Sequence, residues 1–105
     1  MPSRFTLFGS NGSTVAHVAQ LIGEALDTEF SLRESTFKGG EYFFNRDSDG
    51  MEISIERHIP DEEGDYAEPG FSDYEVLVYV NYGKTATEEK IAALSGLHLL
   101  RLETV

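Results

Sequence analysis

Three histidines and no cysteine limit the nucleophilic and metal-binding chemistry that this chain can perform. His17, His58 and His98 lie far apart in the sequence, and no two of them share a metal-ligand spacing on one element. The lack of cysteine excludes disulfides, thiolate metal sites and cysteine nucleophiles. No sequence motif around the three histidines indicates a catalytic Ser/His/Asp arrangement. We therefore predict structural or solvated histidines, no catalytic residue and no bound metal.

A glycine-rich turn runs from Gly9 to Thr14, between an expected strand and an expected helix. Backbone N–H groups at such a helix N-terminus can bind phosphate. The sequence has neither the lysine of a phosphate-binding P-loop nor the third glycine of the dinucleotide fingerprint. A tight turn in which Ser13 caps the helix is the simpler interpretation. A small domain that binds a nucleotide or phosphate at this turn is the alternative function.

Two other acidic patterns fall short of a known site. Residues 47–50 (DSDG) match the start of a calcium loop, but His58 stands where that loop needs its bidentate glutamate. A hairpin turn explains these residues better. Glu52 and Glu56 share one face of a strand about 13–14 Å apart, too far for the two carboxylates of a glycosidase. The acids at 61–65 could hold a divalent ion, but neighbouring acids in a run are expected to repel one another and stay solvated. We therefore predict no bound metal or cofactor.

The acids are concentrated in the middle of the chain. The 105 residues carry 19 Asp and Glu against 8 Lys and Arg, for a formal net charge of −11. Residues 41–75 hold twelve of the acids with only Arg46 and Arg57, whereas residues 1–40 and 76–105 are nearly neutral. This charge excludes a nucleic-acid backbone and an anionic membrane as ligands. A localised patch of one sign instead favours a basic protein partner.

Aromatic side chains alternate with acids in the second half of this acidic region. Acids speed the encounter with a basic partner, and buried aromatic anchors slow its release. We therefore predict that this segment contacts a partner protein. The predicted partner-binding residues are Asp61, Glu62, Glu63, Asp65, Tyr66, Glu68, Phe71 and Asp73.

The apolar periodicity predicts one α+β domain over residues 1–105, with the element order β-α-β-β-β-β-α-β. The expected sheet is mainly antiparallel, and both helices pack on one of its faces. A ferredoxin-like frame with an added hairpin is one such arrangement. Helices are expected from Val15 to Leu26 and from a capping box of Thr85 and Glu88 to Gly96. The expected strands are residues 4–8, 29–36, 41–46, 51–56, 74–82 and 97–102.

Two segments of this predicted fold are candidates for contact with partners. Residues 59–73 form a long loop, and loops of this length in a small domain are often functional. Residues 97–102 are apolar on both faces. A third hypothesis is therefore that an exposed strand edge there pairs with a partner or with a second copy.

The chain begins without a long apolar stretch, so we expect no signal peptide, no membrane span and a cytoplasmic location. As a small, acidic, cysteine-free α+β chain, it resembles the immunity proteins of bacterial toxin–immunity pairs. Residues 37–42 (FKGGEY) and 67–80 resemble segments of small bacterial proteins sometimes grouped with them. The resemblance implies a non-enzymatic protein that binds a toxin domain and blocks its active site. An acidic face would then mimic the phosphates that the cationic cleft of such a toxin attracts.

Overall fold

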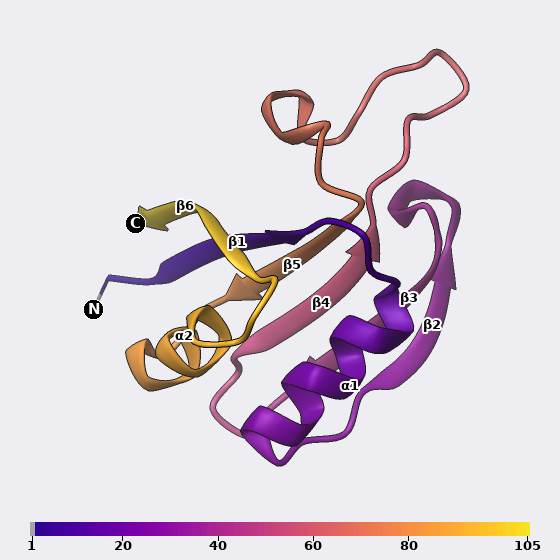
Figure 1. Cartoon of the computed structure of the whole chain (residues 1–105). Coiled ribbons are helices and arrows are strands. Elements are labelled where there is room, and N and C mark those ends of the chain that lie inside the picture. Colours follow the sequence, from indigo (N-terminus) through magenta and orange to yellow (C-terminus); the bar gives the residue numbers. More distant parts are fainter. Residues whose placement is uncertain (1) are drawn as a thin grey trace.

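The computed structural model describes residues 2–105 and shows a twisted six-stranded sheet with both helices on one side of it (Figure 1). This confirms the predicted α+β class and the order of its elements. The strands are β1 (Arg4–Ser10), β2 (Ser31–Ser35), β3 (Gly40–Arg46), β4 (Glu52–Arg57), β5 (Val76–Asn81) and β6 (His98–Thr104). The helices are α1 (Val15–Leu26) and α2 (Thr85–Ala92), with short 3₁₀ turns η1 (Thr36–Lys38) and η2 (Pro69–Phe71).

The strands lie in the order β2-β3-β4-β5-β1-β6, and every neighbouring pair is antiparallel. The helices α1 and α2 follow β1 and β5, so the frame of β4, β5, β1 and β6 connects like a ferredoxin-like sheet. The hairpin of β2 and β3 extends that frame beyond β4. The two edges of the sheet are therefore β2 and β6.

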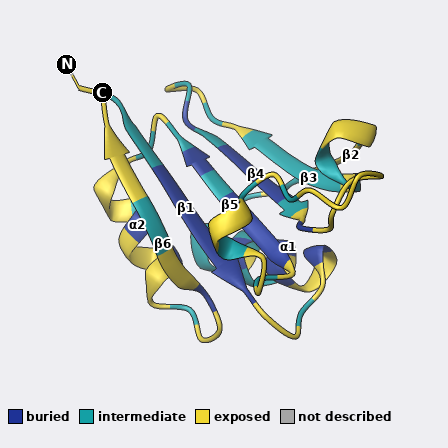
Figure 2. Cartoon of the chain, turned by 90° about the horizontal axis from the view of Figure 1, so that it is seen from above, coloured by how far each residue is buried: buried dark blue, intermediate teal, exposed yellow. Residues whose placement is uncertain are grey.

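The core fills the space between the helices and the sheet. Alternation places Ile53 and Ile55 of β4 on the same face as Val78 of β5, opposite Val18 and Ile22 of α1. All five are at most 1% exposed. Burial of such side chains contributes about 1.5–3 kcal/mol each, so this layer fixes how the helices sit on the sheet. Figure 2 shows the buried positions running along the central strands.

The helix α1 has the predicted bounds, Val15–Leu26, but its cap lies one residue later than predicted. Thr14 is extended and its hydroxyl accepts a hydrogen bond from the His17 N–H at 3.1 Å, so Thr14 rather than Ser13 is the cap. The preceding strand also runs to Ser10, which leaves a shorter turn than the sequence predicts. The helix ends at Asp27, which adopts the left-handed conformation at φ 51°.

The predicted capping box of α2 is wrong. Thr85 is already helical and Lys84 occupies the cap position without a side-chain bond. Glu88 instead pairs with Arg4 of β1 at 2.8 Å, and it is buried. Gly96 does not end the helix either, because the helix stops at Ala92 and Gly96 lies in the following turn.

Neither helix is long and apolar enough to cross a membrane, as judged over residues 2–105.

Several strand limits differ from the expected ones. The strands β2 and β5 are shorter at both ends than the predicted ranges 29–36 and 74–82, and β6 continues to Thr104 rather than residue 102. Tyr82 lies beyond β5 with φ 56°. The hairpin glycine between β3 and β4 is confirmed, since Gly50 has φ +89°.

Candidate partner-binding surface

The acids of residues 41–75 divide into two groups by their contacts. The first group lies on or beside the sheet, and each member pairs with a cation within 3 Å. Its members are Asp47, Asp49, Glu52, Glu56 and Glu68. The second group makes no salt bridge within residues 2–105 and consists of Glu41, Asp61, Glu62, Glu63, Asp65, Asp73 and Glu75. All of this second group except Glu41 therefore lie on the loop of residues 59–75.

His58, immediately before this loop, forms hydrogen bonds to the middle and to the end of the loop. It is 6% exposed, its Nδ1 lies 2.9 Å from the carbonyl oxygen of Tyr74, and its Nε2 accepts from the Glu68 N–H at 3.3 Å. This pair of contacts requires the tautomer with the proton on Nδ1. The backbone N–H of His58 also donates to Glu75. His58 is thus a structural residue, as the sequence predicts, and it holds the loop in one conformation.

Glu68 links the loop to β5 and β6 on the face of the sheet opposite the helices. Its carboxylate accepts from Arg101 of β6 at 2.8 Å and from the Tyr79 hydroxyl of β5 at 2.9 Å. The Arg101 guanidinium holds the pKa of Glu68 below its usual range, against the opposing effect of burial. Burial and the Glu68 carboxylate raise the pKa of Tyr79. The charge of Glu68 is therefore compensated within the chain.

We expect Glu68 to make folding stability depend on acid. A carboxyl whose folded pKa is depressed adds stability above its unfolded value of 4.5 and loses it as the pH falls through the folded pKa. Urea unfolding between pH 6 and about pH 3 should show a steeper loss for the native chain than for Glu68→Gln. Glu63→Gln, an exposed acid of the same loop, should follow the native curve. Equal slopes for all three proteins would contradict the contact.

The residues from Asp61 to Asp65, here called the acidic turn, form a hydrogen-bonded turn. The Asp61 carboxylate accepts from the N–H groups of Glu63 and Asp65, each at 2.9 Å, and Gly64 closes the turn at φ +86°. Glu62 and Glu63 are exposed. The Asp61 carboxylate therefore fixes the backbone of the acidic turn, from which the Glu62 and Glu63 side chains extend into solvent.

A fully exposed aromatic ring lies beside the acidic turn. Phe37 in η1 is 97% exposed, the highest value among the large exposed hydrophobic residues. It lines a pocket of about 440 Å³ together with Ile59, which is 50% exposed, and with Asp61, Asp65 and Tyr66. Neither Phe37 nor Ile59 is among the residues that the sequence predicts to contact a partner. An aromatic residue immediately before Lys38 and a Gly-Gly pair was the available signal.

Gly39 shapes the turn that displays Phe37. Its φ is +75°, and a Cβ there would lie 2.9 Å from the carbonyl oxygen of Arg57. Only glycine satisfies both conditions without strain.

We expect Gly39→Ala to cost about 1–2 kcal/mol of unfolding free energy, the usual cost of forcing an L-residue into left-handed backbone. Urea denaturation measures it. The matched control is Gly70→Ala, because Gly70 lacks a left-handed φ and has nothing within 4 Å of the added Cβ. Equal losses in the two variants would contradict the geometry.

The other predicted contact residues lie in different settings. Tyr66 is half-buried, with its ring edge-on to His58 at 5.0 Å. Phe71 is half-buried against Tyr74 at 6.5 Å. Asp73 is exposed near the far end of the loop. The structure thus brings Asp61, Asp65 and Tyr66 together around one pocket, whereas Glu68 links the loop to β6 and Phe71 packs against Tyr74 of the loop itself.

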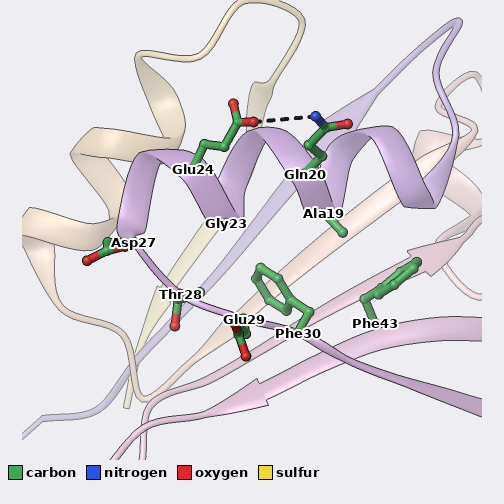
Figure 3. Close-up of a pocket in the computed structure, with 9 residues that line it drawn as sticks. All are labelled: Ala19, Gln20, Gly23, Glu24, Asp27, Thr28, Glu29, Phe30 and Phe43. Carbon is green, nitrogen blue, oxygen red and sulfur yellow. Dashed lines mark hydrogen bonds between the residues drawn. The ribbon is translucent and has the colours of Figure 1, made fainter.

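A second, shallower pocket lies between α1 and the segment leading into β2 (Figure 3). It measures about 630 Å³, and Phe30 and Phe43 form part of its lining. Both rings also pack against the hydrophobic core. Glu24, whose carboxylate accepts from Gln20 at 3.4 Å, and Glu29 add acids to its lining. This pocket has no ring as exposed as that of Phe37, since Phe30 and Phe43 are both half-buried.

The glycine-rich turn before α1 already has a carboxylate beside it. The Gly12 N–H donates to Glu75 Oε1 at 3.0 Å, where a phosphate oxygen would need to bind. This contact gives no support to the alternative nucleotide site. Across residues 2–105, no group of three His, Asp or Glu side chains is placed to hold a metal ion.

The structure places unpaired acids and an exposed aromatic ring on one candidate surface. Its parts are the exposed Phe37 ring, the Ile59 side chain and the acidic turn, brought together where the loop passes η1. Comparison of the chain with protein-family models, with curated proteins and with solved structures found no significant match.

Proposed function

We propose that this chain is a non-enzymatic binding module that docks a basic protein onto the acidic turn and Phe37. The observation that carries the proposal is the division of the acids. Those beside the sheet have cationic partners, whereas Glu62, Glu63 and Asp65 make no salt bridge within residues 2–105, and Asp65 lines the pocket beside the exposed Phe37 ring. Long-range attraction raises the encounter rate, and the ring supplies an apolar anchor.

The pocket beside Phe37 fits the end of a lysine or arginine side chain. The apolar stem of such a residue would pack against Phe37 and Ile59, and its charged head would reach Asp61 and Asp65. A ring that covers the stem also attracts the cation through its π face. The pocket therefore favours a partner that projects a basic side chain from its own surface.

The class of partner that we propose is a bacterial toxin domain with a cationic active site. The chain would then act as an immunity protein that occludes this site by stoichiometric binding. The resemblance in size, charge and composition supports this choice, as does an acidic surface that mimics phosphate groups. A toxin that acts on nucleic acids or nucleotides fits such a surface, because its cleft must attract phosphates.

Growth protection tests the proposal. The reading frame directly upstream of this gene is expressed in a bacterial strain with and without the full chain, and colony formation is counted. We expect the upstream product to prevent growth and the native chain to restore it. An upstream product that is harmless, or whose toxicity the chain does not change, would overturn the proposal.

Charge variants assign the protection to a surface. Reversal of Glu62, Glu63 and Asp65 to lysine should weaken protection. The matched control reverses Glu24, Glu29 and Glu34, which are also exposed, and changes the net charge by the same amount. Protection should survive in the control, and the opposite pattern would place the contact near α1 and β2.

A further inference from the structure

The last strand of the sheet leaves an unpaired apolar edge. In β6, Leu99 is 57% exposed and Leu102 is 46% exposed, and the adjoining Val105 is 80% exposed. Within residues 2–105, β6 pairs with β1 on one side, and no strand pairs with its other side. An uncovered edge strand offers its free backbone groups to another chain.

The backbone of β6 is oriented for such pairing. Ser3 and Val105 exchange both of their backbone hydrogen bonds, at 2.7 and 2.9 Å. Hydrogen-bonded and non-hydrogen-bonded pairs alternate along an antiparallel ladder, and the register places Glu103 opposite Phe5. Glu103 therefore directs its backbone groups toward β1. Leu102, the residue before it, directs its N–H and C=O away from the sheet.

We propose that two copies of this chain associate through β6, antiparallel, about a two-fold axis at Leu102. An axis perpendicular to the sheet keeps the helices of both copies on the same side. Leu102 then lies opposite Leu102 of the second copy, and the two residues exchange backbone hydrogen bonds. Arg101, which also contacts Glu68 and Glu103 of its own chain, then lies opposite Glu103 of the second copy, so that opposite charges meet twice across the axis. Cross-strand pairs of opposite charge stabilise the association.

The opposite edge of the sheet does not offer this complementarity. In β2, an axis at Arg33 or at Glu34 places a charge opposite the same charge. An axis at Leu32 places Ser31 opposite Arg33, which forms no ion pair. The charge complementarity at β6 therefore selects β6 over β2 as the contact between two copies.

The charge distribution also permits association through β6. Residues 76–105 carry three acids and three bases, so this part of the chain is neutral. The acidic turn contacts the segment between β2 and β3, at the other edge of the sheet. Two copies joined through β6 thus keep their acidic turns apart and leave both surfaces free to bind.

Sedimentation velocity of the full chain over a concentration series tests the proposal. We expect a reversible dimer, and Leu102→Lys should raise its dissociation constant by about tenfold or more, because like charges meet at the axis. Leu32→Lys is the matched control, since Leu32 is a similarly exposed leucine on the other edge strand. A native chain that stays monomeric up to about 1 mM, or equal weakening by both substitutions, would overturn the proposal.

Cross-linking keeps the test independent of how Leu102→Lys folds. Because the chain has no cysteine, Leu102→Cys introduces a single thiol, which the axis places next to its copy. Mild oxidation should give covalent dimers of Leu102→Cys in several-fold higher yield than of Leu32→Cys. Equal yields from the two variants would overturn the assignment of the axis.

Discussion

Reversing Glu62, Glu63 and Asp65 to lysine is expected to slow association with the basic partner about tenfold to a hundredfold at low ionic strength. The reason is that these exposed carboxylates supply the long-range attraction, and no salt bridge within residues 2–105 compensates them. Stopped-flow or surface-based kinetics measures the rate constant, with the upstream gene product as the partner.

Salt dependence separates this effect from damage to the fold. Raising the ionic strength screens charges beyond about 10 Å at 0.1 M salt, so the native rate should fall toward the rate of the variant. The control reversal of Glu24, Glu29 and Glu34 should keep most of the native rate and its salt dependence. A variant that associates at the native rate in low salt would contradict the role of the acidic turn.

Phe37→Ala is expected to weaken the complex by about 2 kcal/mol, or ~30-fold in Kd, mainly through faster dissociation. The ring contributes little to the fold, since it is 97% exposed, so the unfolding free energy should change by less than about 0.5 kcal/mol. Titration calorimetry gives the affinity and urea denaturation gives the stability. Leu32→Ala, at another exposed hydrophobic residue, should leave the affinity nearly unchanged.

The affinity and the unfolding free energy of Phe37→Ala answer different questions. Loss of affinity without loss of stability indicates direct contact by Phe37. Unchanged affinity would mean that the partner binds elsewhere on the chain, even if the acids steer its approach.

The fold was predictable where local periodicity determines it. The alternation of Ile53 and Ile55 with Glu52 and Glu56 places one face of β4 in the core, and the structure confirms it. The hairpin turn at Gly50 likewise follows from local turn chemistry.

Errors arose where a distant partner decides the outcome. Glu88 has the spacing of a capping residue, but Arg4, 84 positions earlier in the chain, takes its carboxylate. Propensity cannot register a contact that exists only after the sheet has formed. The cap of α1 differs for a local reason, because the hydroxyl of Thr14, and not that of Ser13, accepts from the His17 N–H.

The candidate site shows the same division. The sequence located the charged segment, because charge is a property of the residues themselves. It could not show that Arg101, 33 positions later, neutralises Glu68, or that η1 brings Phe37 beside Asp65. The loop of residues 59–75 therefore contains both structural acids and acids available for binding, and only their contacts distinguish them.

Amide hydrogen exchange of the full chain, alone and with the purified upstream gene product, tests whether the partner covers Phe37 and the acidic turn. The exchange of each backbone segment reports which surface the partner covers. We expect new protection in residues 36–40, 59–61 and 65–67, which include the lining of the pocket beside Phe37. Protection confined to the pocket of Figure 3, or no protection at all, would contradict this expectation.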